Sequence, residues 1–232
     1  MKTVIVLGKG TLAIQVAEWF LQAPEYVLNL VVPVMPEPKW TDSLAGWCRN
    51  RGVPMVESGH YADIPDVRDA DWRADLAFSV FYDKIIKSWF IEKCGRILNL
   101  HNGPLPRYRG VSPINWALKN SERSHGVTIH EITEGIDDGP IVSQATYSIH
   151  PDFDEVEDVY HRGLRFGWLL FQDTMPVLDQ IKAQPQDHAA ASYYNAKQND
   201  LLGDRRSFTR ARSTGAALPG RGPATGGPGD AA

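Results

Sequence analysis

The chain has 232 residues, of which 43% are hydrophobic and 22% are charged, and its formal net charge is −4. This length suits one domain with a small appendage, and the composition supports a full hydrophobic core. The acidic total argues against a broad electrostatic grip on nucleic acid, although a local basic patch stays open. Cys48 and Cys94 are far apart and form no CxxC motif. We therefore expect neither a disulfide framework nor a metal site.

The N-terminal stretch MKTVIVLGKG resembles a signal peptide for only a few residues, because Lys9 and Glu18 interrupt its apolar pattern. No run of about 18 apolar residues follows, so the sequence predicts no transmembrane helix and no membrane partner. Unpaired cysteines fit a reducing compartment. The expected location is the cytoplasm.

The predicted elements alternate along the chain. Continuous apolar runs predict buried strands over 3–8, 26–34, 53–57, 74–82 and 95–101, and helical spacing predicts helices over 11–22, 43–52 and 113–120. Period-two alternation predicts half-exposed antiparallel strands over 125–132 and 140–149. Residues 154–181 predict one long amphipathic helix, or a helix kinked near Pro176.

This order predicts an α/β, Rossmann-like fold with a mixed, mainly parallel sheet flanked by helices and closed by a long helix. The main domain is expected over residues 1–186, with a short C-terminal extension of the core over 187–210. Residues 211–232 are rich in Gly, Ala and Pro. They have almost nothing to bury, so a disordered tail is predicted.

Two loops fall at the carboxyl ends of predicted parallel strands, the edge at which such sheets bind ligands. The first, GKGTLA, contains Gly8, Lys9 and Gly10. It is open to three interpretations: a dinucleotide phosphate turn, a plain strand-to-helix turn, or an anion contact through backbone N–H groups and Lys9. The dinucleotide interpretation lacks an acidic residue at the end of the second strand.

The second loop, NLHNGPLPRYRG, follows the strand over 95–101. Asn99 and His101 are two residues apart and share one face of that strand. A histidine is well suited to proton transfer near neutral pH, and an amide can donate to the same reacting atom. A lone histidine is more often structural, but Asn99, Asn102 and the proline-stiffened loop favour a functional pair.

The segment EITEGIDDGPIV places Asp137 and Asp138 between two glycines. Taken alone, it indicates an ordinary hairpin turn. With Asn-x-His, P-x-Y-R-G and H-G-V-T-I-H, however, G-x-D-x-G resembles the folate-dependent formyltransferase family over roughly residues 1–182. That family includes glycinamide ribonucleotide transformylase, methionyl-tRNA formyltransferase and the sugar N-formyltransferases. The resemblance carries the family's catalytic Asn, His and Asp onto Asn99, His101 and Asp137, with Asp138 as the alternative acid.

The sequence HNGPLPRYRGVSPINWAL and the segment over 192–210 resemble the sugar N-formyltransferase branch. This resemblance implies transfer of a formyl group from N10-formyltetrahydrofolate, without a metal, to a nucleotide-linked amino-deoxysugar. The expected substrate is of the dTDP-4-amino-4,6-dideoxyglucose type, used for surface polysaccharide or glycolipid synthesis. The tRNA branch carries a further basic domain, for which we expect no room here. Larger sugar-branch relatives continue into a dimerising hairpin, so a homodimer stays open.

The resemblance also implies binding residues. Folate is expected at the segments that contain Phe81, Tyr82, Asp83, Ile85, Ile136 and Asp138. The sugar nucleotide is expected at Gly8, Lys9, Gly10, Lys84, Asn102, Gly103, Arg107, Tyr193 and Tyr194. A diphosphate requires local positive charge, for which Arg109, Arg205 and Arg206 are further candidates. Each of these cations, taken alone, is more often a solvated surface charge.

Two rival functions stay open. One is an NAD(P)-dependent reductase or epimerase built on GKGTLA. The other is a truncated, non-catalytic binder of a sugar nucleotide, although the complete trio of Asn99, His101 and Asp137 argues against it.

Overall fold

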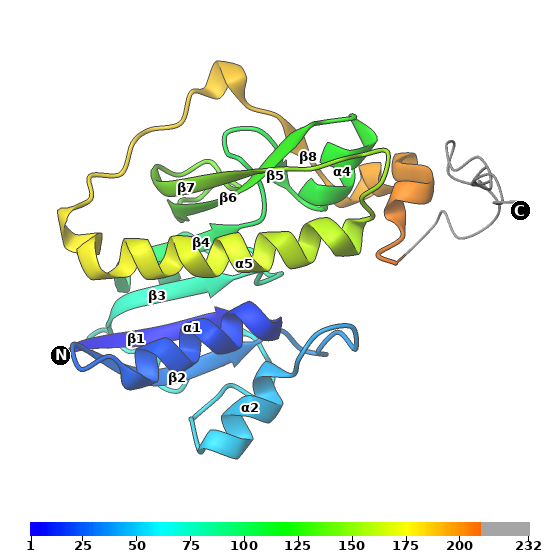
Figure 1. Cartoon of the computed structure of the whole chain (residues 1–232). Coiled ribbons are helices and arrows are strands. Elements are labelled where there is room, and N and C mark those ends of the chain that lie inside the picture. The colour runs from blue at the N-terminus through cyan, green and yellow to red at the C-terminus, as the bar shows by residue number, and fades with distance from the viewer. Residues whose placement is uncertain (210–232) are drawn as a thin grey trace, which may run out of the picture.

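The computed structural model describes residues 1–209. Its centre is a six-stranded sheet in the order β2-β1-β3-β4-β6-β7 (Figure 1). The strands are β1 (Lys2–Gly8), β2 (Tyr26–Pro33), β3 (Ala74–Val80), β4 (Cys94–His101), β6 (Ser124–Glu131) and β7 (Ile141–Ser148). β2, β1, β3 and β4 run parallel, whereas β6 is antiparallel to β4, and β7 to β6. The predicted mixed, mainly parallel sheet is confirmed.

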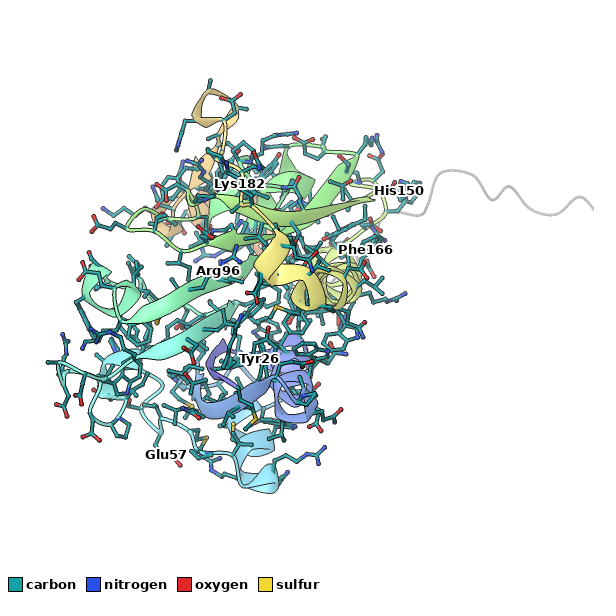
Figure 2. All side chains as sticks on the ribbon, turned by 90° about the vertical axis from the view of Figure 1, so that its left-hand side faces the viewer. Tyr26, Glu57, Arg96, His150, Phe166 and Lys182 are labelled. Atoms are coloured by element: carbon teal, nitrogen blue, oxygen red, sulfur yellow. The ribbon has the colours of Figure 1, made fainter. Side chains whose placement is uncertain are left out.

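The helices are α1 (Gly10–Gln22), α2 (Leu44–Arg51), α3 (Ser88–Ile91), α4 (Pro113–Lys119) and α5 (Val156–Thr174). α1 and α5 lie on the same side of the sheet (Figures 1 and 2). They approach so closely that a Cβ atom on Gly167 would lie 2.9 Å from Leu12 Cδ2. The closing helix ends at Thr174 and continues as a 3₁₀ turn, η2 (Met175–Gln180). Pro176 explains this change, because proline disrupts the α-helical hydrogen bonds of the preceding turn.

Alternation along the strands decides which residues face which side. Leu98 and Leu100 of β4 belong to the core that α1 and α5 cover, whereas Ile97 belongs to a second core on the opposite face. Since successive strand side chains point to opposite faces, Asn99 and His101 lie on the face away from α5. The Arg96 side chain of β4, labelled in Figure 2, donates hydrogen bonds to the Glu131 carboxylate and to the Leu178 backbone oxygen.

Two sequence predictions are wrong in detail. The strand predicted over 53–57 is a single bridge between Met55 and Val31, because Pro54 has no N–H with which to extend a ladder. The strand predicted over 125–132 is not half-exposed: β6 is buried from His125 to His130. Its second face is covered by the Gly-Pro loop, where Thr128 Oγ1 donates to the Gly103 carbonyl at 2.7 Å.

The C-terminal segment, which we define as residues 182–196, connects distant parts of the chain. Gln184 exchanges two backbone hydrogen bonds with Ile141 at the start of β7. The segment then forms η3 (His188–Ala190) and β8 (Tyr193–Tyr194), which pairs in parallel with β5 (Arg109–Gly110). The remaining short helices are η1 (Tyr61–Asp63) and η4 (Ala196–Arg206). No helix within residues 1–209 is long and apolar enough to cross a membrane. The predicted tail over 211–232 lies outside the described residues.

Candidate active site

Strand register assembles a row of polar side chains across β3, β4 and β6. Asn99 pairs with Ser79 on one side and with His130 on the other. Ser79 Oγ donates to Asn99 Oδ1 at 2.8 Å, which leaves the Asn99 Nδ2 group facing His130 Nε2 at 3.1 Å. The amide is therefore held by its two neighbouring strands.

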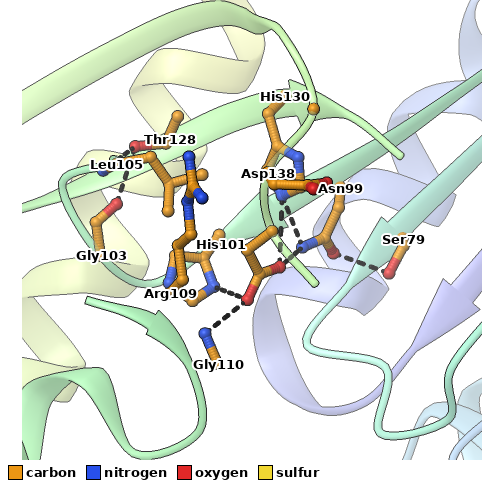
Figure 3. A network of polar contacts seen from close by, with 12 residues as sticks. Ser79, Asn99, His101, Gly103, Leu105, Arg109, Gly110, Thr128, His130 and Asp138 are labelled. Carbon is orange, nitrogen blue, oxygen red and sulfur yellow. Dashed lines mark hydrogen bonds and ion pairs between the residues drawn. The ribbon is translucent and has the colours of Figure 1, made fainter. Parts of the chain in front are cut away.

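Asp137 comes from the loop between β6 and β7, where its backbone has a left-handed φ of 50°. Its carboxylate lies between two imidazoles, 3.4 Å from His101 Nδ1 and 3.4 Å from His130 Nε2 (Figure 3). The Gly110 N–H donates to it at 2.8 Å. Burial by itself would raise the pKa of Asp137, but the positive charge that the two imidazoles carry when protonated, together with this N–H, holds the pKa well below its usual range.

Backbone carbonyls determine where the two imidazoles carry their protons. His101 Nε2 lies 2.8 Å from the Tyr108 oxygen, and His130 Nδ1 lies 2.9 Å from the Glu131 oxygen. A carbonyl oxygen only accepts, so each of these nitrogens is a donor. The nitrogen that faces Asp137 is then unprotonated in a neutral ring. A proton that arrives on His101 Nδ1 therefore forms an ion pair with Asp137.

Beside this network lies a pocket of about 430 Å³. Its floor includes Asn99 and Asp137, and its walls come from the segment after β3, the Asp137 loop and the C-terminal segment. The wall residues are Tyr82, Asp83, Lys84, Ile85, Ile86, Gly110, Val111, Ile132, Thr133, Gly135, Ile136, Tyr193, Asn195 and Ala196, with Ser79 and His130 at the base. Three apolar side chains at this pocket are partly exposed: Ile85, Val111 and Ile136.

Of the residues expected to bind folate, Tyr82, Asp83, Ile85 and Ile136 line this pocket. Phe81 and Asp138 do not. Phe81 packs toward the α1 and α5 side of the sheet, with its ring centroid 6.3 Å from that of Tyr160. Asp138 Oδ1 accepts a short hydrogen bond from Thr133, so its carboxylate is used in a contact within the loop between β6 and β7.

The residues expected to bind the sugar nucleotide divide into two groups. Lys84 and Tyr193 line the pocket, and Lys9 lies near Asp83 and Lys84. Burial lowers the pKa of Lys9, the neighbouring Asp83 charge opposes this shift, and Lys84 adds to it. The other expected residues lie away from the pocket, as described next.

Asn102 and Gly103 are buried behind His101, with their carbonyls bound to His125 and Thr128. Tyr194 stacks on Trp116, with ring centroids 4.3 Å apart. The remaining arginines have partners elsewhere: Arg107 pairs with Glu122, Arg205 with Glu155, Arg206 with Asp200, and Arg109 with Gln186.

The two glycines of GKGTLA are explained by packing. A Cβ atom on Gly8 would lie 2.2 Å from the Val80 oxygen, and one on Gly10 would lie 2.5 Å from Thr41 Oγ1. At the start of α1, Thr11 Oγ1 also donates to the Asp42 carboxylate at 2.7 Å. A protein carboxylate thus lies at the first turn of this helix, and its negative charge disfavours a phosphate there.

Four groups that contact the trio were not identified from the sequence: the side chains of Ser79 and His130, the Gly110 N–H and the side chain of Gln186. His130 carried the clearest signal, as the last residue of the H-G-V-T-I-H motif. Ser79 and Gln186 carried none, because only strand pairing and the path of the C-terminal segment bring them to the site.

In residues 1–209, no group of three or more His, Cys, Asp or Glu side chains is placed to hold a metal ion. The basic and acidic groups at the site are instead arranged as a proton-handling network beside an open pocket.

Residues 66–174 match the formyl transferase family model. The methionyl-tRNA formyltransferase of Fervidobacterium nodosum is 32% identical over 142 residues, which cover 61% of this chain and 45% of that protein. The methionyl-tRNA formyltransferase of Sorangium cellulosum is 30% identical over 169 residues, which cover 72% of this chain and 48% of that protein. The chain thus spans about half the length of the curated relatives that it matches.

Solved structures resemble a larger part of the chain. WlaRD, a sugar 3N-formyl transferase solved in the presence of dTDP and 5-N-formyl-THF, is 26% identical with a TM-score of 0.72. The match covers 85% of this chain and 71% of WlaRD. The N-formyltransferase from Helicobacter canadensis, in complex with folinic acid and dTDP-3-aminofucose, also has a TM-score of 0.72, at 24% identity. By the family match over residues 66–174, the sequence relatives and the shared fold, the chain is similar to members of the formyl transferase family.

Proposed function

We propose that the protein transfers a formyl group from N10-formyltetrahydrofolate to the amino group of a nucleotide-linked amino-deoxysugar. The observation that carries this proposal is that Asn99 and Asp137 line a pocket of about 430 Å³, with the buried His101 in contact with Asp137. Such a cluster supplies both groups that acyl transfer to an amine requires: a proton acceptor and a donor to an oxyanion.

The amine nitrogen adds to the formyl carbon and must lose a proton. His101 Nδ1 is unprotonated in the neutral ring and lies beside the Asp137 carboxylate. The proton ends on Nδ1, where it converts a contact between two acceptors into a charge-assisted hydrogen bond. His101 thus acts as the base, and Asp137 stabilises the imidazolium that forms.

The tetrahedral intermediate carries a negative oxygen. Asn99 Nδ2 contacts Asp137 Oδ1 at 3.4 Å, a long contact that the oxyanion replaces. Because Ser79 holds the amide, this donor is already oriented before substrate binds. The bond from the formyl carbon to the folate N10 then breaks, N10 takes up a proton, and a formamide and tetrahydrofolate leave.

The pocket offers chemically different regions to the two substrates. Ile85, Val111 and Ile136 provide apolar surface for the flat pterin ring of the folate. Lys84 Nζ lies 3.2 Å from Asp83 Oδ1, and Lys9 is near both residues. A diphosphate would replace the Asp83 carboxylate as the partner of the two lysines. The apolar wall and the two lysines therefore support a folate together with a phosphorylated acceptor.

An amino sugar is favoured over tRNA as the acceptor by the C-terminal segment. Tyr193, Asn195 and Ala196 line the pocket, and the match to WlaRD covers more of both chains than the match to the tRNA enzymes. We take a dTDP-linked sugar as the first substrate to test, since WlaRD was solved in the presence of dTDP.

The decisive experiment is product mass spectrometry after incubation with N10-formyltetrahydrofolate and a panel of acceptors. The panel contains dTDP-, UDP- and GDP-linked sugars with an amine at C-3 or C-4, and methionyl-tRNA. We expect the mass of one formyl group to be added to one sugar nucleotide, and the His101→Asn variant to give no product. Formylation of methionyl-tRNA alone would contradict the sugar assignment.

The reductase alternative has its own test. Because Thr41 and the Asp42 carboxylate lie at the first turn of α1, we expect no saturable change in NADPH fluorescence on titration with the protein. Tight NADPH binding without use of the formyl donor would overturn the proposed function.

A further inference from the structure

The buried guanidinium of Arg109 has an unusual set of partners. Its Nε and Nη2 groups both donate to Gln186 Oε1, at 3.0 and 2.7 Å, and His188 Nδ1 lies 3.4 Å from Nη1. Within the part of the chain that the structure describes, these are its side-chain polar contacts, and neither partner is a carboxylate. Burying a cation without a counter-ion costs folding free energy. We therefore expect the contacts of Arg109 to serve a function.

The Gln186 side chain connects this guanidinium to the loop that carries Asp137, and we call this connection the adapter. Its side chain is buried, and its Nε2 group donates to the backbone oxygens of Asp137 and Gly139, at 2.9 and 2.7 Å. Arg109 requires an acceptor and the two carbonyls require donors, so only one orientation of the amide satisfies all of them. The Gln186 side chain is thereby fixed at both ends.

The same short strand also holds the carboxylate of Asp137. The Gly110 N–H, one residue after Arg109, donates to Asp137 Oδ2 at 2.8 Å (Figure 3). β5 thus holds Asp137 twice, at its side chain through Gly110 and at its backbone through Arg109 and Gln186. Asp137 needs such support, because its left-handed backbone is disfavoured for a residue with a side chain.

We propose that Gln186, oriented by Arg109, is a positioning residue that holds Asp137 between His101 and His130. This inference rests on the proposed function, since it concerns the same reaction. It assigns a role in the catalytic site to a residue that lies beyond the matched family region, which ends at residue 174. Misplacement of a catalytic group by about 1 Å can cost about 10²-fold in rate.

The first test compares two glutamines of the C-terminal segment. Gln186→Leu removes this connection, whereas Gln184→Leu makes the same chemical change at an exposed side chain, whose hydrogen bond within residues 1–209 goes to the Lys182 oxygen. We expect kcat to fall about 10²-fold in Gln186→Leu with KM changed by less than about threefold, and both constants to be unchanged in Gln184→Leu.

The pH profile separates positioning from a loss of fold. When Asp137 moves away from the imidazoles, its pKa rises toward the usual value. The same move takes the negative charge away from the imidazolium that forms on the base, so the acid limb of kcat/KM should move to lower pH in Gln186→Leu and stay in place in Gln184→Leu. An unchanged kcat and an unchanged profile in Gln186→Leu would overturn the proposal.

Gln186→Glu tests the proposal even if the leucine variant does not fold. The new carboxylate pairs with Arg109 but has no N–H for the carbonyls of Asp137 and Gly139. We expect its melting temperature to be retained and its kcat to fall as in Gln186→Leu, whereas full activity would contradict the adapter role. If the wild-type protein formylates no acceptor at all, it is the proposed function that fails.

Discussion

At the scale of single residues, the site is a set of polar groups that constrain one another. Ser79 orients the Asn99 amide, and backbone oxygens orient the rings of His101 and His130. Each ring presents an unprotonated nitrogen to Asp137 when it is neutral. The arrangement is therefore ready to accept one proton on an imidazole nitrogen, where the buried Asp137 carboxylate stabilises the positive charge that forms.

Asn99→Ala tests the oxyanion role. We expect kcat to fall about 10²- to 10³-fold, because one oriented donor to the intermediate is lost, with a smaller change in folate affinity. Steady-state kinetics together with folate binding by fluorescence separate the two effects. A variant with normal kcat and weakened folate binding would show that Asn99 binds the donor and does not stabilise the intermediate.

Asp137→Asn tests the charge at the centre of the network. The folded-state pKa of Asp137 lies below its unfolded value of about 3.9, so the carboxylate stabilises the fold above that pH and loses this contribution as the pH falls. We expect the variant to lose about 2 kcal/mol of unfolding free energy at pH 7. Urea titrations at several pH values should show the difference shrinking below about pH 4. A difference that is independent of pH would contradict this charge pairing.

At the scale of elements, the carboxyl ends of β3 and β4 and the loop after β6 meet the C-terminal segment. β5 and β8 are only two residues long each, yet they determine where Gly110 and Tyr193 lie. The ring of Tyr194 packs between Trp116 and Tyr108, with nearly parallel planes at 17° and 13°. Packing at Tyr194 thus holds the neighbouring Tyr193 at the pocket.

Two neighbouring tyrosines should separate stability from binding. Tyr194→Ala removes the stacked ring, so we expect the unfolding free energy to fall by about 2–3 kcal/mol in urea denaturation. Tyr193→Ala removes a half-exposed ring at the pocket, so it should leave stability nearly unchanged and raise KM for the acceptor. The opposite pattern would show that β8 is oriented differently.

At the scale of the whole molecule, α5 connects the two halves of the chain. Its buried residues pack on α1 and on the central strands, and Phe171 lies 5.6 Å from Phe20 and 5.1 Å from Phe78 between ring centroids. The proposed catalytic cluster lies on the other face of the sheet. Both faces of the sheet therefore pack against a core, and the face away from α5 also carries the polar cluster at its carboxyl edge.

Phe171→Ala should lower the unfolding free energy by about 3–5 kcal/mol, since it leaves a cavity where three elements meet. Leu169→Ala, on the same helix but exposed, should change it by less than about 0.5 kcal/mol. Urea denaturation measures both. Because neither residue touches the pocket, KM should be unchanged in the folded fraction, and a raised KM in either variant would contradict this separation.

The sequence by itself determined the alternation of strands and helices and the face shared by Asn99 and His101, and its motifs predicted the trio of side chains that the structure brings into contact. These features depend on local periodicity and on motifs within short segments. Asp138 and Phe81 show the limit of that reasoning: a position in a motif does not say which way a side chain turns.

Only the tertiary structure decided which distant residues complete the site. Gln186 is 49 positions from Asp137, and no pattern in either segment indicates that they meet. Ser79 and His130 reach Asn99 through strand register, and the glycines of GKGTLA are explained by contacts with Val80 and Thr41. Contacts of this kind depend on how the sheet is ordered and how the chain returns to it, which is a property of the packed molecule and not of any one segment.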